Sequence, residues 1–245
     1  MKALIAAEWL KLRTTRLLWG LIPGAVALSI AAVLGAVLSA EGAGVDLETS
    51  AGVNRALHVT GTGSILVLAL GVIMSAGEYR TQTATDTFLT TPKRHHVTIA
   101  KLAVAATIGT GFGIASAAAA LITSHLAYTI EGATFPVDDT EVWTTLAGAV
   151  IYAGLFAVLG VAIGGLIRNQ VIAIVAAFAW ILVIENIAIS LSTSIAQWLP
   201  GAAGQAIVRT PDRDLLPPAA ATAVLAAYGV AIAAIGIAAA TRRDA

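Results

Sequence analysis

Six long runs of apolar residues dominate this 245-residue sequence. A helix needs about 20 mostly apolar residues to cross the hydrocarbon core of a bilayer, and each run has about this length. The runs are continuous and rich in Ala and Leu, whereas the strands of a membrane barrel would alternate. We therefore predict an all-α integral membrane protein with a single transmembrane domain and six transmembrane helices. The expected spans are residues 17–40, 53–76, 97–126, 146–167, 171–191 and 219–240.

The composition supports this fold class. Hydrophobic residues make up 58% of the chain and charged residues only 11%, against about 25% charged residues in an average soluble domain. One soluble core could not bury so much apolar surface, so lipid must act as part of the solvent. Cysteine is absent, which excludes disulfides and cysteine-ligated metal sites.

The charges are distributed unevenly between the two sides of the predicted membrane. With the N-terminus inside, eleven Lys and Arg residues fall inside and three outside, whereas four acidic residues fall inside and nine outside. The positive-inside rule reads an excess of Lys and Arg as cytoplasmic. We therefore expect both termini in the cytoplasm, in agreement with an even number of spans.

The first sixteen residues precede the first apolar run. Ile5, Trp9 and Leu12 recur at helical spacing on one face, while Glu8 and Arg13 lie mostly elsewhere around the helix. This pattern predicts an interfacial helix over residues 1–16, lying along the cytoplasmic leaflet with its tryptophan at headgroup level. The alternative is a basic flank that only orients the first span.

The predicted cytoplasmic segment 77–96 is long for a connection between helices. Thr83, followed three residues later by Asp86, is typical of a helix N-terminus, and Pro92 ends the helix just before it. The short helix between them carries Phe88 and Leu89, which either dock onto a partner or fold back onto the membrane surface. The basic residues that flank it are Arg80, Lys93 and Arg94.

The predicted outer segment 192–218 is apolar but broken by four prolines. It is too short and interrupted to span a bilayer, so we expect a re-entrant or surface-lying segment there. Trp198 is its expected anchor at the membrane interface.

Glu185 is the one ionisable residue well inside a predicted span. An intramembrane carboxylate is costly and by default marks a functional site, such as a transport pathway. The competing interpretation is structural: Glu185, with its neighbour Asn186, bonds the backbone of the outer segment.

Pairs of glycines four residues apart allow helices to approach closely in a membrane. In a chain this rich in Ala and Gly such spacings also arise by chance. The pairs are Gly20 and Gly24, Gly109 and Gly113, and Gly160 and Gly164.

Motifs for catalysis are absent from the sequence. There is no GxxxxGK[ST] loop for binding ATP, and no HExxH or GxSxG motif. His95 and His96 have no carboxylates beside them, which favours a solvated loop over a metal site. We expect no enzyme activity and neither a catalytic residue, a cofactor nor a metal in this chain.

The cytoplasmic segment GEYRTQTATDTFLTTPKRHHVTIAKL resembles the signature of the type-2 ABC permease family, the membrane subunits of ABC exporters. Glu78-Tyr79-Arg80 resembles its opening, Thr91-Pro92 its turn, Lys93-Arg94 its basic pair, and Ala100-Lys101-Leu102 the start of the third span. Gln82 stands where the family usually has glycine. The N-terminal AEWLKLRTTR is similar to the family's connecting helix.

The resemblance implies an ATP-driven exporter in the bacterial cytoplasmic membrane, built from two permease subunits, identical or homologous. Two separate ATPase subunits would bind ATP and Mg²⁺. The helix between the second and third spans would then be a coupling helix, with Phe88 and Leu89 docking onto the ATPase and Glu78 and Arg80 bridging to the N-terminal helix. The residues implied in coupling are Glu78, Arg80, Asp86, Phe88, Leu89, Lys93 and Arg94.

Two other functions stay open. The first is an ion- or proton-coupled secondary transporter that uses Glu185 and needs no ATPase. The second is a membrane scaffold or immunity factor that binds a partner without transporting anything.

Overall fold

The computed structural model describes residues 1–81, 94–211 and 214–242, and their regular secondary structure is entirely helical. Six of the described helices are long and apolar enough to cross a membrane, which confirms the predicted number. These candidate spans are Leu18–Leu38, Ser50–Arg80, His95–Ile130, Thr140–Ile167, Gln170–Leu191 and Pro218–Ala239.

Several candidate spans consist of more than one helical element. The second contains α3, the 3₁₀-helix η2 and α4, and the fifth contains α8, the π-helix η3 and α9. The elements are α1 (Lys2–Thr14), α2 (Arg16–Leu38), η1 (Glu41–Ala43), α3 (Ser50–His58), η2 (Val59–Gly63), α4 (Ser64–Arg80), α6 (Arg94–Ile130), α7 (Thr140–Ile167), α8 (Gln170–Ala179), η3 (Trp180–Ile184), α9 (Glu185–Leu191), α10 (Thr193–Ala196), α11 (Pro200–Ile207) and α12 (Pro218–Arg242).

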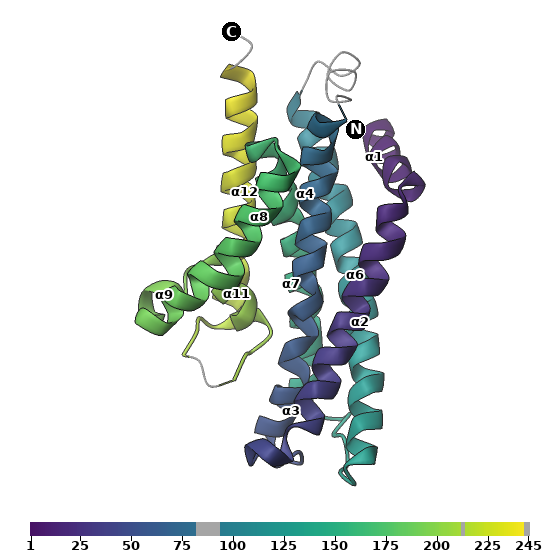
Figure 1. Cartoon of the computed structure of the whole chain (residues 1–245), viewed down its shortest axis with the longest axis vertical. Coiled ribbons are helices and arrows are strands. Elements are labelled where there is room, and N and C mark those ends of the chain that lie inside the picture. Colours follow the sequence, from purple (N-terminus) through teal and green to yellow (C-terminus); the bar gives the residue numbers. More distant parts are fainter. Residues whose placement is uncertain (82–93, 212–213, 243–245) are drawn as a thin grey trace.

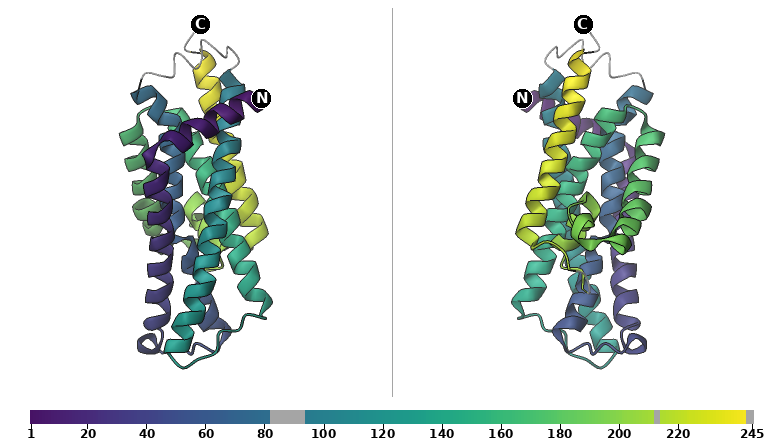
Figure 2. Two further views of the ribbon diagram at one scale, coloured as in Figure 1. Left: turned by 90° about the vertical axis from the view of Figure 1, so that its right-hand side faces the viewer. Right: turned by 90° about the vertical axis from the view of Figure 1, so that its left-hand side faces the viewer.

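The long helices form an elongated bundle with both termini at one end (Figure 1). We call this the terminal end, and the opposite end, where α3 and the connection between α6 and α7 lie (Figure 2), the distal end. Helix α7 is the centre of the bundle, because it packs extensively against α4, α6 and α12.

Glycines on α7 and α6 bring the central helices into backbone contact. A Cβ atom at Gly160 would overlap the carbonyl oxygen of Leu68 in α4. One at Gly109 of α6 would lie 2.6 Å from the carbonyl oxygen of Ala153 in α7. Small residues give such interfaces their dispersion contacts, because lipid removes the hydrophobic drive for helices to associate.

The first glycine pair behaves differently. A Cβ at Gly20 or Gly24 would meet no atom within 4 Å, so within the described chain this pair makes no helix contact. Two of the three glycine spacings in the sequence therefore mark close packing in this subunit, and the third does not.

A short break separates α1 from α2. Thr15 adopts an extended conformation (φ −86°, ψ 128°), and its hydroxyl donates to the carbonyl of Leu12 at 2.7 Å. The break allows α1 to cross the bundle at an angle instead of continuing α2 (Figure 2).

The turn between α7 and α8 is short, as the predicted spans 146–167 and 171–191 require. Arg168 is left-handed (φ 56°), which ends α7. The side chain of Asn169 then accepts a hydrogen bond from the backbone N–H of Ile172 at 3.1 Å and caps α8.

The elements between α8 and α12 lie about halfway along the bundle (Figures 1 and 2). Helix α9 leans outwards, and α11 lies back against α7 and α12. Ala203, Ala206 and Ile207 of α11 are buried in a core cluster with Phe156 of α7 and Leu225 of α12.

Candidate functional site

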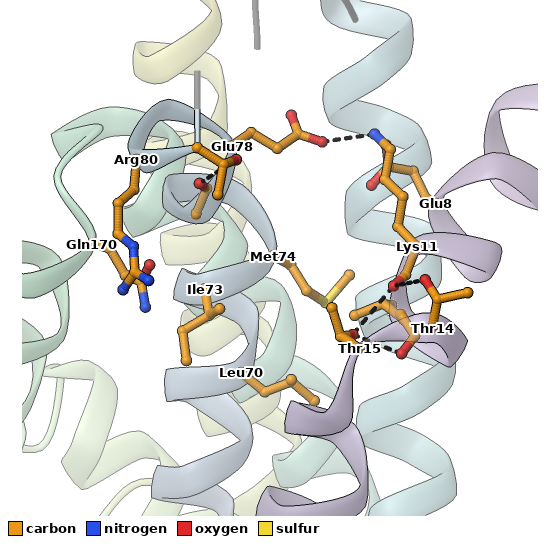
Figure 3. Close-up of a pocket in the computed structure, with 13 residues that line it drawn as sticks. Glu8, Lys11, Thr14, Thr15, Leu70, Ile73, Met74, Glu78, Arg80 and Gln170 are labelled. Atoms are coloured by element: carbon orange, nitrogen blue, oxygen red, sulfur yellow. Dashed lines mark hydrogen bonds and ion pairs between the residues drawn. The ribbon is translucent and has the colours of Figure 1, made fainter. Parts of the chain in front are cut away.

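Four charged side chains from three helices meet at the terminal end. Lys101 of α6 contacts Glu8 of α1 at 2.8 Å and Glu78 of α4 at 2.7 Å. Lys11 of α1 contacts the same two carboxylates, each at 2.7 Å. We call Glu8, Lys11, Glu78 and Lys101 the charge cluster; Figure 3 shows three of its members.

The charge cluster is electrically neutral and partly removed from solvent. Glu8 and Lys101 are each only 5% exposed, and Lys101 also donates to the carbonyl oxygen of Met74 at 3.3 Å. Burying charges carries a large desolvation penalty, which is offset only where each charge has good partners. Here each lysine bonds to both glutamates, so none of the four charges is left unpaired.

Lys11 lies at the more exposed edge of the charge cluster. Burial alone would lower the pKa of its ammonium group, but hydrogen bonds to Glu78 and Glu8 outweigh burial and raise that pKa above its ordinary value. The two carboxylates therefore hold Lys11 in its charged form.

Local sequence explains how α1 presents its part of the charge cluster. Glu8 and Lys11 are three residues apart, so they lie on the same helical face. Leu12, on that face as well, packs into a core cluster with Leu70 and Met74 of α4. This contact fixes the rotation of α1 and points both charged side chains toward α4 and α6.

The residues singled out in the sequence are placed as follows. Glu78 accepts a hydrogen bond from Lys11 of α1. Arg80 instead lines the side of a cavity that lies away from α1, as does Gln170 (Figure 3). Trp9 and Arg13 are exposed on α1. Lys11 and Lys101 are the cluster members that were not predicted as site residues.

Part of the predicted coupling set lies outside the described residues: Asp86, Phe88, Leu89 and Lys93, together with the side chain of Arg94. The described flanks of this connection are α4, which ends at Arg80, and α6, which begins at Arg94. Both flanks lie at the terminal end, next to the charge cluster.

Glu185 is 1% exposed, and one of its oxygens accepts a hydrogen bond from the backbone N–H of Ala202 at 2.9 Å. Ala202 lies in the first turn of α11, where free N–H groups and the helix dipole favour a negative charge. The second oxygen of Glu185 has no hydrogen-bond partner in the described part of the chain.

The side chain of Asn186 provides hydrogen-bond donors to backbone carbonyl groups of the fifth span. Its side-chain amide donates to the carbonyl oxygens of Leu182 at 3.1 Å and Ile181 at 3.4 Å. Both carbonyls belong to η3, the π-helical turn. Such a turn disturbs the regular α-helical bonding, so a neighbouring amide that pairs with its carbonyls stabilises it.

Six apolar helices with charged groups gathered at one end define a multi-pass membrane protein. The family model described as "ABC-2 family transporter protein" matches residues 4–185, a range that includes the whole charge cluster. The chain belongs to this family and is an ABC transporter permease. Neither the comparison with curated proteins nor the one with solved structures gave a match.

Proposed function

We propose that this permease is the membrane subunit of an ATP-driven exporter and that its terminal end receives the ATPase. The observation that carries the proposal is the charge cluster. It ties α1 to α4 and α6, the two helices that flank the connection 82–93. A force applied to this connection would reach three helices at once.

The cluster is suited to transmitting such a force. Charge-assisted hydrogen bonds are about twice as strong as neutral ones, and Lys101 holds α1 and α4 together through two of them. Because Leu12 fastens α1 to the bundle core, α1, α4 and α6 would move as one unit. Rigid-body motion of this kind is a common way to switch between two conformations.

The partners follow from the same proposal. A cytoplasmic ATPase subunit would bind ATP and Mg²⁺ and dock onto Phe88 and Leu89. A second permease, identical or homologous, would complete the translocation path. The excess of Lys and Arg at the terminal end supports a cytoplasmic location for that end.

The test is co-purification in mild detergent, followed by reconstitution with the ATPase that is recovered. We expect Phe88→Glu to abolish ATPase binding, and Glu78→Gln to leave binding intact but to uncouple ATP hydrolysis from export. Glu48→Gln is the matched control, since Glu48 is an exposed glutamate at the distal end. If Glu78→Gln and Glu48→Gln export equally well, the coupling role of the charge cluster is wrong.

A second candidate function rests on the buried, unpartnered oxygen of Glu185. A secondary transporter would use that oxygen to bind a proton or cation within the membrane. It would transport in vesicles without any ATPase, which distinguishes it from the exporter. A scaffold would bind a partner in the co-purification experiment and show no flux in vesicles.

A further inference from the structure

A cavity of about 560 Å³ opens at the terminal end between α1, α4 and the start of α8. Its base is apolar and is formed by Leu12, Leu70, Ile73 and Met74. Its rim carries charged and amide side chains, among them Lys11, Arg80 and Gln170 (Figure 3). We call this space the rim cavity; its volume lies within the range of cavities that bind small molecules.

The charges around the rim cavity leave one positive charge unbalanced. Lys11 and Lys101 neutralise Glu8 and Glu78 within the charge cluster. Arg80 is the remaining charged residue of the lining, and it forms no ion pair in the described part of the chain. The cavity therefore offers a single net positive charge above an apolar base.

Arg80 and Gln170 also provide the hydrogen-bond donors. Both side chains line the cavity (Figure 3), and neither side chain makes a hydrogen bond within the described residues. The threonine hydroxyls on the rim differ, because those of Thr14 and Thr15 already donate to backbone carbonyls of α1. A guanidinium group presents a fork of N–H donors that matches phosphate oxygens.

We propose that the rim cavity binds one anionic phospholipid from the surrounding bilayer. Its phosphate contacts Arg80 and Gln170, and its acyl chains cover Leu70 and Ile73. These two residues belong to a candidate span, so the base of the cavity lies where lipid chains are the natural solvent. Charge complementarity selects an anionic over a zwitterionic headgroup. The proposal requires no ATPase and holds whether or not the exporter function is correct.

Native mass spectrometry of the purified chain, incubated with equal amounts of phosphatidylglycerol and phosphatidylcholine, tests this site. We expect the natural protein to retain one phosphatidylglycerol in preference to phosphatidylcholine. Arg80→Gln should weaken that retention about tenfold, the lower end of what a hydrogen bond to a charged group contributes, and Arg80→Lys should restore part of it. Arg13→Gln is the matched control, because it removes the same charge from an exposed position outside the cavity.

Gly77→Leu is an independent variant that keeps Arg80. Gly77 lines the cavity, and a Cβ there would make only ordinary contacts at 3.7–3.8 Å, so the leucine would fill the space without a backbone clash. We expect it to abolish retention as well, and excess inorganic phosphate not to compete. Equal retention of the two lipids, or an equal loss in Arg13→Gln and Arg80→Gln, would overturn the proposal. Competition by free phosphate would overturn it too, because the ligand would then be a soluble anion.

Discussion

Each lysine of the charge cluster is bonded to both glutamates, and this determines how the cluster responds to change. Replacing a whole buried ion-pair network with apolar residues is often neutral for stability. Removing one partner is destabilising, because the remaining charge stays buried without compensation for its desolvation. Glu8 and Lys101 are the most buried members. We therefore expect the cluster to determine how α1, α4 and α6 pack against one another, more than to raise the stability of the fold.

We expect Lys101→Met to lower the free energy of unfolding by about 3 kcal/mol, because it leaves Glu8 buried with only Lys11 as a partner. Lys11→Met should have a much smaller effect, since the Lys11 side chain is 46% exposed and water can replace it. Unfolding of the two variants in detergent micelles measures the difference. An equal loss of unfolding free energy in the two variants would show that burial does not determine how much each lysine contributes to stability.

The raised pKa of Lys11 gives a dependence on pH. Because the folded pKa lies above the ordinary value of 10.5, the contribution of Lys11 to stability is fully present below pH 10.5 and is lost as the pH rises through the folded pKa. The stability difference between the natural protein and Lys11→Met should therefore be constant at neutral pH and shrink above pH 10.5. Denaturation at a series of alkaline pH values measures it; a difference that grows with pH would contradict the assignment.

Two members of this cluster, Glu78 and Glu8, stand out in the sequence for separate reasons, and its two lysines do not, for a physical reason. Glu78 belongs to a recognisable motif and Glu8 to an amphipathic helix. Lys101 lies 93 residues from Glu8, and its proximity depends on the angle at which α1 crosses the bundle. That angle is set by the break at Thr15 and by the packing of Leu12, which periodicity alone does not specify. The three-residue spacing of Glu8 and Lys11 was the one sequence feature that could have indicated that Lys11 belongs to the cluster.

At the scale of elements, apolar length determines the spans, and local features determine their irregularities. The six runs are confirmed because length and hydropathy are the quantities a bilayer selects. The π-helix at 180–184 was not expected, since its residues are as apolar as those of a regular helix. Asn186 is the one sign of it in the sequence, because its side-chain amide can donate hydrogen bonds to backbone carbonyls within the apolar run.

Close packing between α4 and α7 makes Gly160 intolerant of a larger residue. We expect Gly160→Ala to lower the free energy of unfolding by about 2 kcal/mol, because the added methyl group would overlap the Leu68 carbonyl and push the helices apart. Gly24→Ala is the control: the position is open, and alanine favours a helix by up to about 1 kcal/mol. Thermal unfolding in one detergent compares them, and a stable Gly160→Ala would refute the packing.

Glu185 caps α11, and its variants separate that role from transport. Glu185→Gln keeps an oxygen that can accept the Ala202 N–H, so we expect near-normal stability and export. Glu185→Leu has no acceptor and should lose about 1–2 kcal/mol of stability. Unfolding and vesicle export are measured for both. If Glu185→Gln folds normally but exports nothing, Glu185 acts in transport and the secondary-transporter hypothesis gains.

At the scale of the whole molecule, the arrangement divides the chain into two ends with different chemistry. The terminal end holds both termini, the charge cluster and the rim cavity. The distal end holds the connection 131–139 and seven of the eleven acidic residues that the structure describes. Under the positive-inside rule, this division predicts that the end richer in Lys and Arg faces the cytoplasm. It leads to a direct test of which end faces the cytoplasm.

The chain has no cysteine, so a single introduced cysteine reports the side of the membrane on which it lies. Thr81→Cys at the terminal end and Thr134→Cys at the distal end both replace exposed, uncharged residues and leave the charge balance intact. In whole cells, a membrane-impermeant maleimide should label Thr134→Cys and not Thr81→Cys; after permeabilisation it should label both. The reverse pattern would place the charge cluster outside the cell, where no ATP is available, and would exclude ATPase docking at this end.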